Sequence, residues 1–193
     1  ILWHIVMNTK FTNACERIDQ PCPPIWMMRQ AGRYQQGYME MKEQFTFEQM
    51  CKLPRIAART AMLPIDQFDF DIAILFSDIL FPIEGLGVPL KFAPGPQFEW
   101  TINEDNYKQH SDVDRATQHM QFQATAVQAT RESLHKSKSL IGFVGGPWTL
   151  LNYATGKKPN MDLKWKAAYM EEVIVPVLSR NIHLQLEAGA EKV

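Results

Sequence analysis

The sequence predicts an α/β fold of the (β/α)8 TIM-barrel type, with the N-terminal half of the barrel in this chain. Three short apolar runs, each ending in polar residues or glycine, alternate with segments of helical composition. Strands that are apolar on both faces are typical of parallel sheets covered by helices. No G-x-G-x-x-G fingerprint follows these runs, which favours a barrel over a dinucleotide-binding sheet. Because a complete barrel takes about 250 residues, we expect about three strands and the start of a fourth.

Composition argues against several classes of function. The charged fraction is 21% and the formal net charge is −1, so no overall field attracts nucleic acid or an anionic membrane. The longest apolar run, Ile72 to Phe76, is too short to span a bilayer. The three cysteines have no C-x-x-C spacing, which indicates free thiols in the cytoplasm rather than disulfides or a zinc site. Residues 1–7 are expected to be a leader or remnant, and residues 8–193 the N-terminal part of the barrel domain.

The first expected strand leads into a loop with two arginines. A helix over residues 8–18 and a proline-rich segment precede this strand, which is predicted over Ile25 to Met28. Arg29 and Arg33 follow it, and a guanidinium stays charged and needs an anionic partner. Gly32 lets the backbone turn tightly or approach a ligand. The loop is therefore either an anion-binding site or a strand end with two surface ion pairs.

Helices are then expected over residues 36–44, 46–52 and 55–67. Thr46 and Gln49 form a capping-box pattern at the start of the second helix. Pro64 is expected to kink or shorten the third.

The second expected buried strand, Phe70 to Phe76, ends in Ser77 and Asp78. An ionised carboxylate among apolar residues costs several kcal/mol unless it is hydrogen-bonded or paired. Asp78 is therefore either a cap for the following turn or a group that faces a ligand.

The remaining segments continue the alternation. Residues 88–92 and 97–100 are expected to form a small hairpin, residues 113–136 a long helix, and residues 139–144 the third strand. A helix that contains Tyr153 is expected from residue 147. Residues 162–188 are expected to form a helical segment broken at Pro176, and residues 190–193 the start of a fourth strand. The third strand ends in Gly145 and Gly146, which would let a ligand approach the backbone. There is no phosphate-loop G-K-[ST] signature.

Three stretches together carry a family resemblance. They read WMMRQAGRY (Trp26–Tyr34), AILFSDIL (Ala73–Leu80) and IGFVGGPWTLLNY (Ile141–Tyr153). With the helix end QLEAGA (Gln185–Ala190), they closely resemble the uroporphyrinogen decarboxylase family. The resemblance runs from about Asn8 to Val193, and an arginine loop followed by an FSDI strand end is close to diagnostic.

The resemblance implies a (β/α)8 barrel that forms a homodimer and needs no metal or organic cofactor. It implies decarboxylation of the four acetate side chains of uroporphyrinogen III to methyl groups, giving coproporphyrinogen III in porphyrin and haem biosynthesis. Arg29, Asp78 and Tyr153 would be catalytic, with Asp78 accepting hydrogen bonds from the pyrrole N–H groups. The implied substrate-binding residues are Arg33, Met28, Gln30, Ala31, Gly32 and Phe143.

The family also uses a serine or threonine and a histidine from the C-terminal half of its barrel. Neither motif is present in this sequence, and none of its five histidines is assigned that role. One alternative is therefore a truncated, non-catalytic module that binds a tetrapyrrole or another polycarboxylate, and another is an assembly or non-functional product with exposed sheet edges. The corrinoid-linked methyltransferases are the nearest enzymatic alternative, but they hold zinc through Cys and His, and the cysteines here lack suitable spacing.

Overall fold

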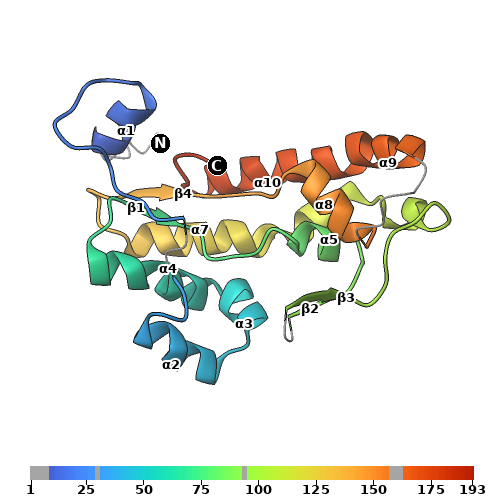
Figure 1. Ribbon diagram of the computed structural model, residues 1–193, viewed down its shortest axis with the longest axis horizontal. Coiled ribbons are helices and arrows are strands. Elements are labelled where there is room, and N and C mark those ends of the chain that lie inside the picture. Colours follow the sequence, from blue (N-terminus) through green and yellow to red (C-terminus); the bar gives the residue numbers. More distant parts are fainter. Residues whose placement is uncertain (1–8, 29–30, 93–94, 157–162) are drawn as a thin grey trace. The chain divides into compact units, whose positions relative to one another are not determined.

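The computed structural model describes residues 9–28, 31–92, 95–156 and 163–193. Helices lie before, between and after two parallel strands along the chain (Figure 1). By their internal contacts they form two compact units. The first consists of Ile1–Ser77, Gln123–Gly142 and Gln185–Val193, and the second of Asp78–Phe122 and Phe143–Leu184.

The first unit begins with four helices. They are α1 (Thr9–Cys15), α2 (Gln36–Gln44), α3 (Phe47–Lys52) and α4 (Pro54–Phe68). The predicted capping box is confirmed, because the Gln49 N–H donates to Thr46 Oγ1 at 3.2 Å and the Thr46 N–H donates to Gln49 Oε1 at 2.9 Å. Pro54 opens α4, where its missing N–H costs nothing. Pro64 does not shorten this helix, which continues to Phe68.

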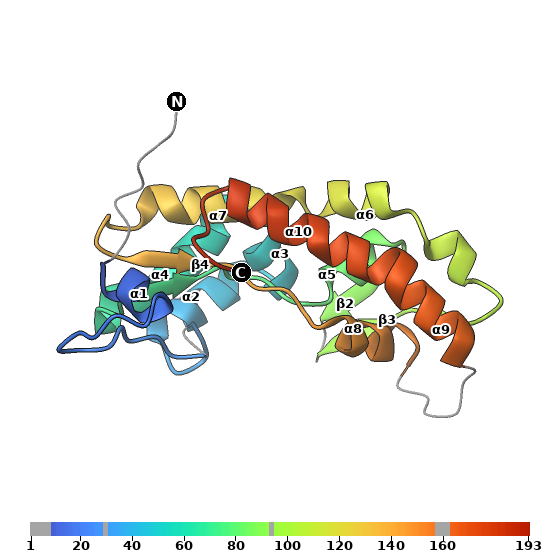
Figure 2. The same cartoon turned by 90° about the horizontal axis from the view of Figure 1, so that it is seen from above.

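The parallel sheet of the first unit contains β1 (Ile72–Ile74) and β4 (Ser139–Ile141). Ala73 lies opposite Leu140, and both are fully buried. Helix α7 (Gln121–Ser133) is the last of several elements between the two strands and leads into β4 (Figures 1 and 2). Parallel strands need a long crossover of this kind. Ile141 also forms a parallel bridge with Lys192. The expected start of a further strand at the chain end is therefore confirmed.

The expected first strand, Ile25 to Met28, is wrong. Ile25 is 50% exposed and Met28 is 85% exposed. The segment meets the sheet at one point, where the Asp71 N–H donates to the Ile25 carbonyl at 3.0 Å and the Ile25 N–H donates to Asp71 Oδ2 at 2.9 Å. In a regular β-ladder the Ile25 N–H would donate to a backbone carbonyl, whereas here it donates to the Asp71 side chain. An apolar run becomes a strand only where a neighbour supplies successive backbone partners, and here it supplies one pair.

The second unit contains mostly short elements, and the last of them continues into the first unit from Gln185. They are α5 (Phe81–Gly85), β2 (Leu90–Phe92), β3 (Pro96–Phe98), η1 (Tyr107–His110), α6 (Val113–His119), α8 (Pro147–Ala154), α9 (Leu163–Tyr169), the π-helical turn η2 (Met170–Ile174) and α10 (Val175–Glu187). The predicted hairpin is confirmed, because β2 and β3 pair antiparallel. Figure 2 shows α9 and α10 following one another end to end in one helical segment. Helix α8 packs against η2, which lies between them in this segment.

Two expected long helices are interrupted. The segment 113–136 breaks at Met120, whose φ of −74° and ψ of −3° leave the α-helical range, and whose side chain is fully buried. The segment 162–188 changes at the π-helical turn that ends at Ile174, two residues before Pro176. In this second case the sequence placed the interruption close to its true position, because proline lacks the N–H that a regular helix would use.

Candidate active site

The arginine loop forms a tight turn in the first unit. Arg29 and Gln30 lie outside the described residues. The Gln35 N–H donates to the Gly32 carbonyl at 3.0 Å, and the Gly32 N–H donates to Gln35 Oε1 at 3.3 Å. The buried Gln35 amide also donates to Gln67 Oε1 at 2.9 Å and so fixes the turn to α4. Sequence reasoning missed Gln35, because nothing in the local pattern shows which amide a loop will use.

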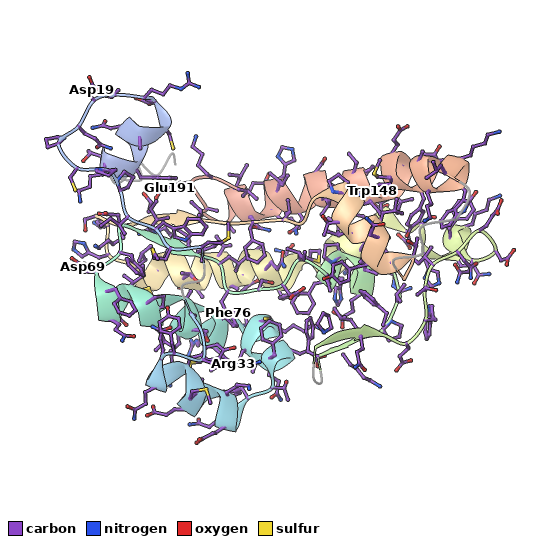
Figure 3. All side chains as sticks on the ribbon, in the orientation of Figure 1. Asp19, Arg33, Asp69, Phe76, Trp148 and Glu191 are labelled. Carbon is purple, nitrogen blue, oxygen red and sulfur yellow. The ribbon has the colours of Figure 1, made fainter. Side chains whose placement is uncertain are left out.

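The side chains of Met28 and Arg33 are accessible in this loop. Met28 is 85% exposed, and Arg33 is also exposed (Figure 3). An accessible guanidinium can bind a carboxylate through two parallel hydrogen bonds.

The loop shares a cluster of apolar side chains with the end of β1. Ala31 and Phe76 both pack against the buried cluster of Tyr38, Met41 and Met50. The ring of Phe76 meets the ring of Tyr38 edge-on, with centroids 6.1 Å apart. The cluster thereby holds Ala31 and Phe76 against the same core, although the two residues are far apart in sequence.

Asp78 follows Phe76 by two residues and begins the second unit. Its side chain is half-buried, and Oδ1 accepts a hydrogen bond from the Leu80 N–H at 2.9 Å. The expected turn-capping contact is therefore present. Burial raises the pKa of the Asp78 carboxyl, and the Leu80 hydrogen bond only partly opposes this effect. Within residues 31–92, the Leu80 N–H is a donor to this carboxylate, and it binds Oδ1.

In the second unit, the loop after β4 packs against the residue that follows Asp78. A Cβ on Gly145 would lie 3.0 Å from Ile79 Cβ and 2.2 Å from Leu150 Cδ1, so only glycine fits there. Phe143 is half-buried two residues before Gly145. Tyr153 is also half-buried and lies on α8, which begins immediately after Gly146. The second unit therefore contains Asp78, Phe143 and Tyr153, whereas Met28, Ala31, Gly32 and Arg33 belong to the first.

The histidines within the described residues make local contacts or lie exposed. His110 Nδ1 lies 3.0 Å from the Leu86 carbonyl oxygen, and His119 Nε2 lies 2.8 Å from Glu84 Oε2. His135 Nδ1 lies 2.8 Å from the Ser137 hydroxyl, and His183 is exposed.

Metal-ligating side chains do not gather in the part of the chain that the structure describes. Over residues 9–28, 31–92, 95–156 and 163–193, no three or more His, Cys, Asp or Glu side chains are placed to hold a metal ion. Cys15 and Cys22 are exposed and Cys51 is buried, and none of these three cysteines is in a disulfide. Within the same ranges, every helix is too short or too polar to cross a membrane.

Parallel strands with helices between them, and polar and glycine loops after them, define an α/β protein. The structure is similar to that of a methyltransferase from Methanosarcina mazei, with a TM-score of 0.72, 16% sequence identity, and coverage of 95% of this chain and 56% of the other. This likeness shows the fold alone.

Comparison with known sequences identifies the family. The model of the uroporphyrinogen decarboxylase (URO-D) family matches residues 7–192. Uroporphyrinogen decarboxylases from Geotalea uraniireducens and Carboxydothermus hydrogenoformans are each 35% identical over 97% of this chain. The chain belongs to the uroporphyrinogen decarboxylase family. It spans 58% and 57% of the lengths of these two relatives.

Proposed function

We propose that the full-length protein converts uroporphyrinogen III to coproporphyrinogen III by decarboxylating its four acetate side chains without a cofactor, in porphyrin and haem biosynthesis. The observation that carries the proposal is the Asp78 carboxylate. It is half-buried, has a raised pKa, and accepts a hydrogen bond from the Leu80 N–H, in a chain of this family. Such a group is costly to ionise until a ligand supplies further donors.

A cyclic tetrapyrrole supplies those donors. Its pyrrole N–H groups converge on its centre, where one carboxylate can accept them, and its rim carries carboxylates. In the proposed complex, Asp78 accepts the N–H groups, while Arg29 and Arg33 bind the rim carboxylates. The exposure of Arg33 supports this role. We also propose substrate contacts for Tyr153, for Phe143, and for Met28, Gln30, Ala31 and Gly32 of the arginine loop.

Decarboxylation needs an electron sink, and a protonated pyrrole provides it. A proton adds to a ring carbon, the bond between the acetate methylene and its carboxylate breaks, and carbon dioxide leaves while the bonding electrons flow into the ring. A second proton converts the methylene to a methyl group, and the ring releases the first. Asp78 stabilises the cationic pyrrole electrostatically. Arg29 holds the departing acetate in position.

The rest of the proposal concerns the whole protein. We infer that it forms a closed (β/α)8 barrel, assembles as a homodimer and works in the cytoplasm. The parallel pairing of β1 with β4 and the bridge at Lys192 support the barrel. Cysteines outside disulfides suit a reducing compartment, and this holds for Cys15, Cys22 and Cys51.

The test is to incubate the full-length protein with uroporphyrinogen III under reducing conditions and to separate the porphyrins after oxidation. Coproporphyrin is the expected product, and its absence would contradict the proposed activity. Asp78→Asn is expected to abolish most of the turnover, whereas Asp19→Asn, which changes an exposed carboxylate in the same way, is expected to have no effect. Tetrapyrrole binding without any product would instead favour the non-catalytic binding module.

Arg33 can be tested by the same assay. Arg33→Ala is expected to raise KM by about tenfold or more, because a charge-assisted hydrogen bond contributes about 1.5–3 kcal/mol. Arg59→Ala is the matched control, because Arg59 is an exposed arginine on α4. An equal effect of the two substitutions would show that Arg33 contributes only general surface charge.

A further inference from the structure

A chain of buried amides lies under the strand ends of the first unit. Gln123 on α7 donates from Nε2 to the Ser77 hydroxyl oxygen at 2.7 Å. Gln185 on α10 donates from Nε2 to Gln123 Oε1 at 3.3 Å. Gln123 is 2% exposed and Gln185 is fully buried. The backbone hydrogen bonds of strands and helices do not require buried side-chain amides. A buried amide is also costly unless it is hydrogen-bonded.

The same amides reach the end of β4. A Cβ on Gly142, the residue after β4, would lie 2.0 Å from Gln185 Oε1. The Gln185 amide therefore occupies the space that a side chain at position 142 would fill. The Gly142 N–H donates to the Lys192 carbonyl at 2.8 Å, which fixes the backbone at this point. Helices α7 and α10 are thus linked through side chains to the carboxyl ends of both strands.

We propose that Gln123 and Gln185 are positioning residues for the decarboxylation, and that Gln123 acts through Ser77 on the location of the Asp78 carboxylate; this inference rests on the proposed function. Ser77 immediately precedes Asp78, and Gly142 immediately precedes Phe143. One amide thus binds the covalent neighbour of Asp78, and the other lies against the covalent neighbour of Phe143.

The physical reason is directional. Apolar packing fixes a strand end only loosely along its length, whereas a hydrogen bond of 2.7 Å from a buried amide to a half-buried hydroxyl fixes one atom pair. Misplacing a catalytic group by about 1 Å can cost about a hundredfold in rate. Asp78 lies beyond the end of β1, where ladder hydrogen bonds no longer hold the chain. The Gln123 to Ser77 hydrogen bond supplies a fixed point one residue before it.

The test compares substitutions at both ends of this hydrogen bond in the full-length protein. Gln123→Met keeps the side-chain length and removes the amide, and Ser77→Ala removes the acceptor. Each is expected to lower kcat about tenfold to a hundredfold with little change in KM. Ser77→Thr keeps the hydroxyl and is expected to restore activity. Gln128→Met is the matched control, because Gln128 is an exposed glutamine on α7.

The outcomes separate this inference from the proposed function. If the unaltered protein makes coproporphyrinogen and both Gln123→Met and Ser77→Ala keep its kcat, the positioning role is overturned. If the unaltered protein makes no coproporphyrinogen, the proposed function fails. The affinity for uroporphyrinogen is then compared among the same variants. A purely structural role would lower the melting temperature and leave kcat of the folded fraction unchanged, which also overturns the inference. If Gln123→Met does not fold, the pair Ser77→Ala and Ser77→Thr decides.

Gly142→Ala provides an independent check. The added methyl group displaces the Gln185 amide and so disrupts the hydrogen bonds that run from Gln185 through Gln123 to Ser77. Its kcat is expected to fall as in Gln123→Met, and the combined double variant is expected to lose no more than either single one, because both act through the same chain. Additive losses would show that the two positions act separately and would overturn the proposed link.

Discussion

Asp78→Asn is expected to leave the protein at least as stable as the unaltered chain at pH 7, and more stable than Asp78→Ala. Burial raises the pKa of the Asp78 carboxyl, because the charged form is partly removed from water. Asparagine removes that charge and keeps a side-chain oxygen for the Leu80 N–H, which donates over 2.9 Å. Alanine removes the acceptor as well, at a cost of about 1 kcal/mol for one such hydrogen bond. The two variants should therefore differ by about 2–4 °C in melting temperature.

The pH dependence follows from the direction of the shift. The pKa of Asp78 is higher in the folded protein than its ordinary value of 3.8. Between these two values the folded state still holds a proton that the unfolded state has lost, so the free energy of unfolding falls as pH rises through that window. The advantage of asparagine over aspartate is therefore expected to be absent below the ordinary pKa, and to grow until the folded-state pKa is passed.

Urea unfolding of the three proteins between acidic and neutral pH measures both effects. Equal destabilisation by asparagine and alanine at neutral pH would refute the reasoning, because the fold would then need the charge rather than the acceptor. In the decarboxylation assay, Asp78→Asn is expected to lower kcat by about 10²–10³-fold, the usual effect of losing one electrostatic group in an active site. A gain in stability together with a loss of rate would mark Asp78 as a group retained for function at a cost to the fold.

Three further substitutions test the fold by chemical denaturation. Thr46→Ala is expected to lower the free energy of unfolding by about 1 kcal/mol, because it removes the side-chain cap of α3; no change would mean that the helix end frays at no cost. Tyr169→Phe is expected to cost about 1 kcal/mol, because the buried hydroxyl donates to the His110 carbonyl at 2.6 Å; a neutral result would mean that water replaces it. Arg131→Met is expected to cost about 3–5 kcal/mol, because Glu191, with a side chain 2% exposed, loses the guanidinium 3.4 Å away; a loss below about 1 kcal/mol would contradict this account.

Sequence reasoning identified the elements whose cause is local. The capping box at Thr46 and the hairpin of β2 and β3 depend on residues a few positions apart, and both are confirmed. The strand over Ile25 to Met28 depends on a neighbour that only the tertiary structure supplies, and it is wrong. The break at Met120 is of the same kind, because no proline or glycine marks it and the burial of Met120 accompanies it.

The candidate site divides in a similar way. Asp78 stood out in the sequence because an ionised carboxylate among apolar residues is costly. In the structure, burial raises the pKa of this carboxyl, as such a cost implies. Gln35, Gln123 and Gln185 did not stand out, because a glutamine on a helix or in a turn is usually a solvated residue. Their roles depend on partners 32 to 62 residues away along the chain, which no local pattern can reveal.

The two glycines after β4 show how the structure refines a sequence motif. The pair was interpreted as a place where a ligand approaches the backbone. Gly145 cannot serve in that way, because Leu150 Cδ1 lies 2.2 Å from where its Cβ would be, and the residue is buried. Gly146 is exposed, and the nearest atom to its Cβ position is Thr149 Oγ1 at 3.8 Å. Close packing therefore requires glycine at position 145, and the backbone that a ligand can approach begins at Gly146, at the start of the helix that holds Tyr153.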